Sequence, residues 1–159
     1  HIAREKPDTD GAIPSGNSFG LHNLIRLATL TGDPGYDAAA RHSFKGLSRS
    51  IARGAMDHAL AALERASDRP LELVIVHPDK GQTSDLMAAM RQLYLPNATV
   101  FELTESQVKS LSPEVPWLEG KLAIGGKTTG YVCERGVCQL PVFDAPSLER
   151  QIPRPPPLD

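Results

Sequence analysis

Two sets of side chains in this sequence have the types and the spacing that chemistry needs. The first is a polar stretch, DGAIPSGNS at residues 10–18, which combines a carboxylate with hydroxyl and amide groups. The second is the pair Cys133 and Cys138. Carboxylate, hydroxyl and amide groups suit the binding of polar ligands, whereas paired thiols suit redox chemistry or metal binding.

The polar stretch at 10–18 leads directly into an apolar helical pattern from Phe19 to Leu30. The first N–H groups of a helix have no partner within it, so they and the neighbouring polar side chains can bind a ligand. We expect Asp10, Ser15 and Asn17 to be substrate-binding residues on this basis. Ser15, Asn17 or Ser18 can equally cap the helix, which is worth about 1 kcal/mol, and both interpretations stay open.

The two cysteines lie on either side of Arg135 and Gly136. If these two residues form a hairpin turn, Cys133 falls opposite Cys138 in a non-hydrogen-bonded pair, with Cα atoms roughly 4.5 Å apart. That separation is within disulfide range. The pair can be two reduced packing residues, a reversible disulfide or part of a zinc site. Zinc would need two more ligands, and no histidine pair has ligand spacing near either cysteine, so we expect no metal.

Other chemistry has weaker support in the sequence. The loop His77–Ser84 follows a predicted strand but lacks the glycine spacing of nucleotide-binding loops, so we expect no cofactor. The strand-to-helix elbow of serine hydrolases is absent. A glycosidase needs two carboxyl groups about 5 to 9.5 Å apart. Asp10 is a local candidate, and Glu5 and Asp8 are alternatives that fit solvated loop charges better. A second carboxylate would have to come from helices outside this sequence, so the catalytic residues of any such enzyme stay unknown.

The elements that must position these groups change in type along the chain. Apolar residues at helical spacing predict helices over 19–30, 34–53 and 55–67, with Asp33 as the N-cap of the second and Pro34 at its first position. The first two are joined by a very short connection, which predicts an antiparallel helical hairpin. In the third helix, Met56, Leu60 and Leu63 share one side.

A strand-rich region follows from Pro70. The apolar run 71–76 predicts a strand covered on both faces. A helix beginning at Thr83 or Ser84 and a second strand at 100–103 complete a right-handed parallel βαβ unit. Thr104 and Gln107 have the spacing of a capping box for a short helix. Residues 122–124 predict a third strand, and the cysteine-bearing hairpin completes the region.

Charge and hydropathy exclude several classes of protein. The 17 basic and 19 acidic side chains are not clustered, which argues against a nucleic-acid partner. No apolar run approaches the roughly 20 residues that span a bilayer. We therefore expect a cytoplasmic protein with neither a nucleic-acid nor a membrane partner.

The polar stretch at 10–18 also resembles that of the thioredoxin domain-containing family that includes spermatogenesis-associated protein 20. The resemblance continues through LTGD at 30–33, the run 71–76, YLPN at 94–97 and the cysteine region 131–142. It implies an N-terminal thioredoxin-like domain followed by an α/α six-hairpin barrel, similar to those of sugar epimerases and glycosidases. The thioredoxin Cys-x-x-Cys motif is absent here, so the resemblance implies that this chain is a C-terminal fragment.

The resulting expectation is a mixed fold. Residues 1–69 are the last helices of the α/α barrel, residues 70–152 are a small α/β unit with a parallel βαβ and a β-hairpin, and residues 153–159 are a proline-rich tail. Two functions follow. In one, Asp10, Ser15 and Asn17 bind a carbohydrate-like small molecule in an epimerase- or glycosidase-like barrel. In the other, the barrel positions the thioredoxin-like domain, and Cys133 and Cys138 form a reversible disulfide. The partners implied are the missing thioredoxin-like domain and barrel helices.

Overall fold

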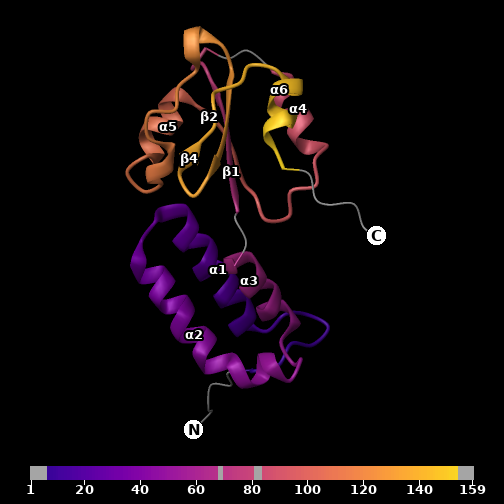
Figure 1. The fold of residues 1–159 in the computed structure, drawn as a ribbon. Helices are drawn as coiled ribbons and strands as arrows, with labels where there is room; N and C mark the ends of the chain where they lie inside the picture. Colours follow the sequence, from indigo (N-terminus) through magenta and orange to yellow (C-terminus); the bar gives the residue numbers. More distant parts are fainter. Residues whose placement is uncertain (1–6, 68–69, 81–83, 154–159) are drawn as a thin grey trace. The chain divides into compact units, whose positions relative to one another are not determined.

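The structure is a computed structural model that describes residues 7–67, 70–80 and 84–153. The chain divides into two compact units, His1–Arg69 (unit 1) and Pro70–Asp159 (unit 2). Unit 1 contains helices only among its described residues, and unit 2 contains the sheet (Figure 1). Residues 154–159, which belong to the predicted proline-rich tail, lie outside the described part of the chain.

Unit 1 consists of α1 (Gly16–Thr31), α2 (Pro34–Ala52) and α3 (Asp57–Ser67). The predicted helices are confirmed, with slightly shifted ends. Asp33 is the N-cap of α2 and accepts a hydrogen bond from the Gly35 N–H at 2.7 Å, as predicted. Gly32 ends α1 in the left-handed region at φ 67°, which glycine adopts at no steric cost. This two-residue connection returns the chain so that α1 contacts both α2 and α3.

The core of unit 1 differs from expectation in the third helix. Leu21 and Ile25 of α1 are buried, whereas Phe19 is 53% exposed. In α3 the buried positions include Ala59 and Ala62, and the exposed fraction of Leu60 is 51%. The prediction that Leu60 lies on the same side of the helix as Met56 was therefore wrong. The small alanine side chains form the contact face because they let neighbouring helices approach closely.

Unit 2 is built on a four-stranded sheet in the order β2-β1-β3-β4. Strand β1 (Leu71–His77) pairs in parallel with β2 (Thr99–Thr104) and antiparallel with β3 (Thr129–Glu134), and β3 pairs with the two-residue β4 (Val137–Cys138). Helix α4 (Asp85–Arg91) connects β1 to β2, which confirms the predicted parallel βαβ connection. The sheet as a whole is mixed because β3 runs against β1.

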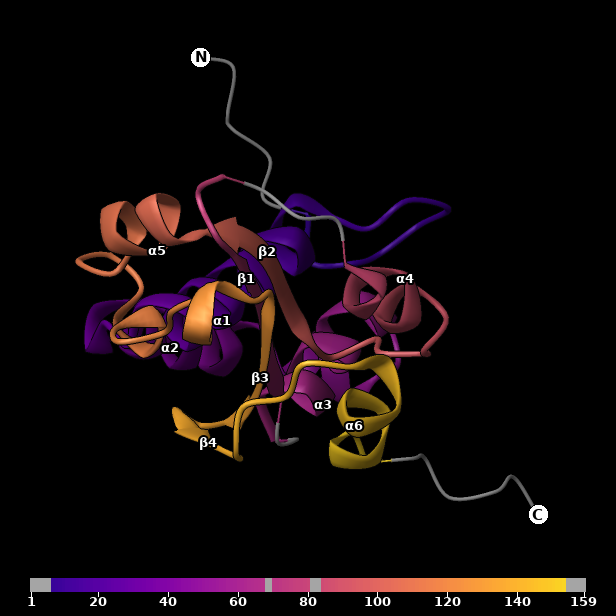
Figure 2. The ribbon, with the colours of Figure 1, turned by 90° about the horizontal axis from the view of Figure 1, so that it is seen from above.

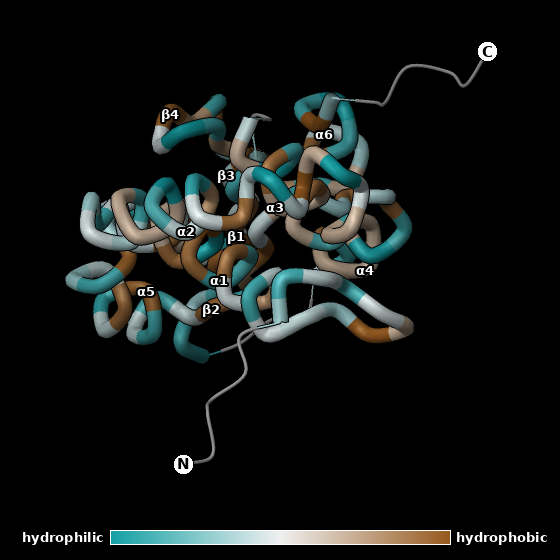
Figure 3. The backbone as a smooth tube through the Cα atoms, turned by 90° about the horizontal axis from the view of Figure 1, so that it is seen from below, coloured by the Kyte–Doolittle hydropathy of each residue, from teal (hydrophilic) through white to brown (hydrophobic). Residues whose placement is uncertain are grey.

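Helices cover both faces of β1. Helices α4 and α6 (Ala145–Gln151) lie on one face and α5 (Glu105–Leu111) on the other (Figure 2). Leu73, Ile75 and Val132 pack with α4 and α6 on the first face. On the second face Val74 and Val76 are also fully buried. The run 71–76 is therefore covered on both sides, as predicted, and Figure 3 shows β1 as an apolar segment of the chain.

One expectation for unit 2 was wrong, and one helix was missed. Residues 122–124 form no strand, because Ile124–Gly126 is a short 3-10 helix that contains Gly125 at φ 61°. Helix α6 was not predicted, although Asp144 caps it by accepting from the Ser147 N–H at 2.9 Å and a proline occupies its first turn. The capping box of Thr104 and Gln107 is confirmed.

The six-hairpin barrel stays a prediction. Three helices of unit 1 are compatible with part of a helical barrel, but a closed ring requires further helices. The observed class is a mixed fold with a helical unit and an α/β unit.

Candidate functional site

The polar loop of unit 1, residues 10–18, is held together by its own side chains. Ser15 is the N-cap of α1 and its hydroxyl accepts from the Ser18 N–H at 3.2 Å. Asp10 Oδ1 accepts from the Ser15 N–H at 2.8 Å and from the Ser18 hydroxyl at 2.7 Å. The capping interpretation is therefore correct for Ser15, and the carboxylate of Asp10 reinforces the cap.

Asp10 also ties the loop to the start of α3. Its Oδ2 accepts from the His58 N–H at 3.0 Å, and its own N–H donates to the Ala55 carbonyl at 2.7 Å. Burial would raise the pKa of Asp10, but the hydrogen bonds from Ser15, Ser18 and His58 outweigh it and lower the pKa to about 2. Two helix N-termini face this carboxylate, and both favour its charged form.

The three predicted binding residues do not converge on one cavity. A hollow of about 410 Å³ in unit 1 is lined by Asp10 together with Asp57 and His58, but not by Ser15 or Asn17. Asn17 instead donates from Nδ2 to the Pro7 carbonyl at 2.7 Å. The sequence offered no signal for His58, because its contact with Asp10 spans 48 positions of the chain.

The cysteine hairpin of unit 2 has the predicted register. Cys133 pairs with Cys138, and Glu134 pairs with Val137. Arg135 and Gly136 have φ values of 51° and 76°, so both turn residues have the positive φ of a type I′ turn. The cysteines are joined by a disulfide, with Cα atoms 3.9 Å apart.

The two sulfur-bearing residues differ in exposure. Cys133 is 1% exposed on β3, whereas Cys138 is exposed on the edge strand β4. Backbone hydrogen bonds tie the returning chain to β3 on the side of this pair away from the turn: the Gln139 N–H donates to the Val132 carbonyl, and Gly130 exchanges two bonds with Val142. Backbone hydrogen bonds therefore stabilise the hairpin in addition to the disulfide.

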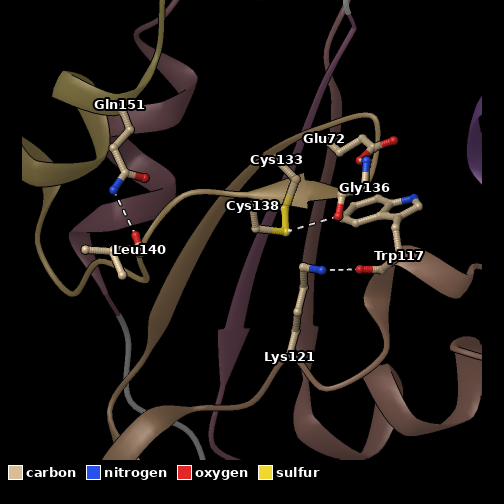
Figure 4. The surroundings of a disulfide bond; sticks show 8 residues. All are labelled: Glu72, Trp117, Lys121, Cys133, Gly136, Cys138, Leu140 and Gln151. Carbon is tan, nitrogen blue, oxygen red and sulfur yellow. Dashed lines mark hydrogen bonds between the residues drawn. A yellow bond between two sulfur atoms is a disulfide. The ribbon is translucent and has the colours of Figure 1, made fainter.

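Two buried charged residues, Glu72 and Lys121, lie around this disulfide (Figure 4). Glu72 is the cross-strand partner of Cys133, and its carboxylate accepts from the Gly136 N–H at 2.8 Å. The Lys121 amino group donates to the Trp117 carbonyl. Its Nζ lies 5.3 Å from the ring centre of Trp117 and 5.9 Å from that of Tyr131, within cation–π range.

Burial shifts both charged groups toward their neutral forms. It raises the pKa of Glu72, against the Gly136 hydrogen bond and the charge of Lys121. It lowers the pKa of Lys121, and the charge of Glu72 only partly offsets this. Sequence reasoning missed both residues. The position of Glu72 inside an otherwise apolar strand was the available signal, because an acidic side chain is seldom fully buried without a partner.

The carboxyl ends of β1 and β2 do not form an anion site among the described residues. Asp79 accepts from the Ser106 N–H at 2.9 Å and from its hydroxyl at 2.6 Å, so a carboxylate already occupies the start of α5. His77 bonds with Thr128 and Glu102, at 3.0 Å each. A hollow of about 710 Å³ beside α5 is lined by mixed charges, including Asp79, Glu105 and Lys109.

Neither a metal cluster nor a membrane span is present in residues 7–67, 70–80 and 84–153. No three His, Cys, Asp or Glu side chains gather there at metal-binding distance. The helices of the same ranges are too short or too polar to cross a bilayer.

The chain therefore has a mixed fold, with a helical unit that contains the polar loop and an α/β unit that contains the disulfide. Among known proteins, the chain is similar to spermatogenesis-associated protein 20 of Homo sapiens and of Rattus norvegicus, with 28% identity to each over 92% of this chain. An uncharacterized protein of Caenorhabditis elegans is 27% identical over 89% of the chain. The chain is thus a relative of spermatogenesis-associated protein 20, but it spans only about a fifth of the length of these relatives (19% to 20%). No family model matches it, and no solved structure matches it significantly.

Proposed function

We propose that this chain is part of a redox-linked protein in which Cys133 and Cys138 form a reversible disulfide. The observation that carries the proposal is a disulfide across a hairpin whose second sulfur belongs to an exposed residue, Cys138. In this proposal the helices of unit 1 belong to a barrel that positions a thioredoxin-like domain elsewhere in the intact protein.

The position of the disulfide supports switching over a purely structural role. A disulfide stabilises a fold mainly by closing a loop in the unfolded chain, and closing a loop of about five residues is worth only about 2 kcal/mol. The type I′ turn and the backbone bonds of Gln139 and Gly130 do not involve the sulfur atoms, so we expect them to remain when the disulfide opens. Reduction should therefore change local chemistry at the hairpin while the sheet persists.

A redox titration tests this proposal. The whole chain is equilibrated in glutathione buffers of defined redox potential and quenched with acid. Free thiols are then alkylated, and the number of alkyl groups is measured by mass spectrometry. Two alkylations should appear together as the buffer becomes reducing, and they should disappear again on reoxidation. Two free thiols under every condition, or reduction only after a denaturant is added, would contradict the proposal.

A second proposal concerns carbohydrate binding or processing, and the hollow beside Asp10 favours it. Asp10 and Asp57 both line this hollow, and polar side chains can orient the hydroxyl groups of a sugar. In this proposal Asp10, held in place by its hydrogen bond from the Ser15 N–H, lines one side of a larger pocket in a six-hairpin barrel. Sugar binding by the intact protein should be lost in Asp57→Asn and retained in Asp37→Asn, whose carboxylate lies on exposed α2 beside Arg41. Equal binding by both variants would remove the hollow from the site.

A further inference from the structure

The two sulfur atoms of the hairpin are not equivalent targets for an incoming thiol. Thiol–disulfide exchange proceeds by attack of a thiolate on one sulfur, along the S–S bond, while the other sulfur leaves. Attack on Cys138 comes from the open side of the edge strand β4, beside Val137, which is 76% exposed. Attack on Cys133 would have to come through the layer that buries it to 1% exposure.

The register of the sheet places the side chain of Cys133 in a charged layer. Glu72 is its partner across β1, and Tyr131 lies two residues earlier on the same strand, so the three side chains share one face. Lys121 lies over the Tyr131 ring on that face, with Nζ 5.9 Å from the ring centre. Figure 4 shows Glu72, Trp117 and Lys121 around the disulfide.

The titratable groups on this face act in opposite directions on a Cys133 thiolate. The ammonium of Lys121 stabilises it, because a nearby cation lowers the pKa of a thiol. The carboxylate of Glu72 disfavours it, although the Gly136 N–H holds part of that charge. The Tyr131 hydroxyl donates to the Leu122 carbonyl at 2.7 Å and accepts from the Leu122 N–H, so its hydrogen bonds go to the backbone.

We propose that the disulfide opens in one direction: an external thiolate attacks Sγ of Cys138, and Cys133 leaves as the thiolate that Lys121 stabilises. This inference rests on the proposed redox function. In the first step the bond between the incoming sulfur and Cys138 forms while the Cys133–Cys138 bond breaks. A second external thiolate then attacks the incoming sulfur and releases Cys138. The protein disulfide is reduced to two thiols, two external thiols become one disulfide, and the two protons of those thiols pass through solvent to the cysteines.

Trapping the mixed disulfide tests which sulfur is attacked. The folded, oxidised chain is exposed briefly to reduced glutathione or, in a second arm, to a peptide carrying two cysteines. The free thiol is then alkylated, and the adducts are mapped by peptide mass spectrometry. The adduct should lie on Cys138 and the alkyl group on Cys133. The arm that reacts faster shows whether a small thiol or a dithiol peptide is the better reductant of this disulfide. Adducts on Cys133, or in equal amounts on both, would overturn the inference.

Single-cysteine variants provide an independent measurement. Cys133→Ser leaves the exposed thiol, and Cys138→Ser leaves the buried one. In the folded state Cys133→Ser should react with oxidised glutathione at least about a hundredfold faster than Cys138→Ser, because access limits the rate. Equal rates in variants with unchanged circular dichroism would contradict the assignment.

Variants of Lys121 test its role as a positioning residue. In the Cys138→Ser background, Lys121→Met should raise the pKa of the Cys133 thiol, read from thiolate absorbance, and Lys121→Arg should leave it near its starting value. In the chain with both cysteines, Lys121→Met should slow reduction by at least about threefold and Lys121→Arg should not. An unchanged thiol pKa in folded Lys121→Met would remove Lys121 from the mechanism. A disulfide that never reduces reversibly would instead defeat the proposed function itself, so the two failures are distinguishable.

Discussion

The polar loop of unit 1 and the cysteine hairpin of unit 2 both contain side chains that could do chemistry beside a turn. The contacts of these side chains differ between the two regions. In the polar loop Asp10 accepts three hydrogen bonds from its own chain, and each bond stabilises a helix start. In the hairpin the sulfur of Cys138 belongs to an exposed residue, next to the buried charges of Glu72 and Lys121.

The difference shows how a structural polar cluster can be told from a chemical one. The hydrogen bonds of Asp10 lower its pKa and keep it ionised, which suits a helix cap and not a general acid. Around the disulfide, burial shifts Glu72 and Lys121 in the opposite sense, away from their charged forms. Groups held away from their preferred charge state are the more usual companions of chemistry.

The largest expected effect on stability comes from removing one of the two buried charges of unit 2. Lys121→Met removes the part-buried hydrogen bond to the Trp117 carbonyl and the cation that offsets the charge of Glu72, so the free energy of unfolding of unit 2 should fall by about 3 kcal/mol. Urea unfolding followed by fluorescence of Trp117, the single tryptophan of the chain, measures it. Lys127→Met, at an exposed lysine, is the matched control and should stay within about 0.5 kcal/mol of the parent. Adding Glu72→Gln to Lys121→Met should recover part of the loss, and no recovery would argue against coupling of the two charges.

The next effect belongs to Asp10 and should depend on pH. Since its folded pKa is lowered to about 2 from an ordinary value of 3.8, its contribution is present above about pH 4 and is lost as pH falls toward 2. Asp10→Asn should therefore cost unit 1 up to about 2 kcal/mol near pH 7, and the difference should shrink in acid. Far-ultraviolet circular dichroism reports this, because the three longest helices of the described chain lie in unit 1. A loss that stays constant down to pH 2 would mean that the charge of Asp10 is not what stabilises the loop, and Asp37→Asn serves as the exposed control.

A smaller effect is expected at the hairpin turn. Gly136→Ala places a Cβ at φ 76°, which costs roughly 1 to 2 kcal/mol for a residue other than glycine. No atom lies within 4 Å of the added Cβ, so the cost comes from the backbone alone. The urea midpoint of Trp117 fluorescence should fall accordingly. Gly136→Asn, which tolerates this region better, should cost less, and a reversed order would show that backbone conformation is not the cause.

The smallest effect is expected for Asn17. Its side-chain bond to Pro7 is exposed, so Asn17→Ala should change the stability of unit 1 by less than about 0.5 kcal/mol. Ser15→Ala should cost about 1 kcal/mol, since it removes the N-cap of α1. Thermal unfolding by circular dichroism compares the two. Equal losses would show that the loop does not rely on the capping network described here.

Local signals in the sequence predicted much of the secondary structure. Turn chemistry placed Arg135 and Gly136 and hence the pairing of Cys133 with Cys138, because a two-residue turn sets the register of its strands. The cap at Asp33 and the capping box at Thr104 were also visible, since each depends on residues at most three positions apart.

Features that depend on distant contacts were missed. The buried face of α3 could not be assigned because alanine and leucine are both apolar, and only packing decides that Ala59 is inside and Leu60 outside. The use of Asp10 was ambiguous for the same reason: its partner His58 lies 48 positions away. Lys121 stands in an irregular segment with no periodicity, so nothing local indicated that its amino group reaches Trp117 and the neighbourhood of the disulfide.

The central claim is that the hairpin disulfide opens while unit 2 stays folded. Urea unfolding of the oxidised and the reduced chain, each followed by Trp117 fluorescence, tests it most directly. Both forms should unfold cooperatively, with the reduced form less stable by at most about 2 kcal/mol and fully restored after reoxidation. A reduced chain that has already lost its native Trp117 signal without urea would contradict the account, because the disulfide would then be a structural requirement of the unit.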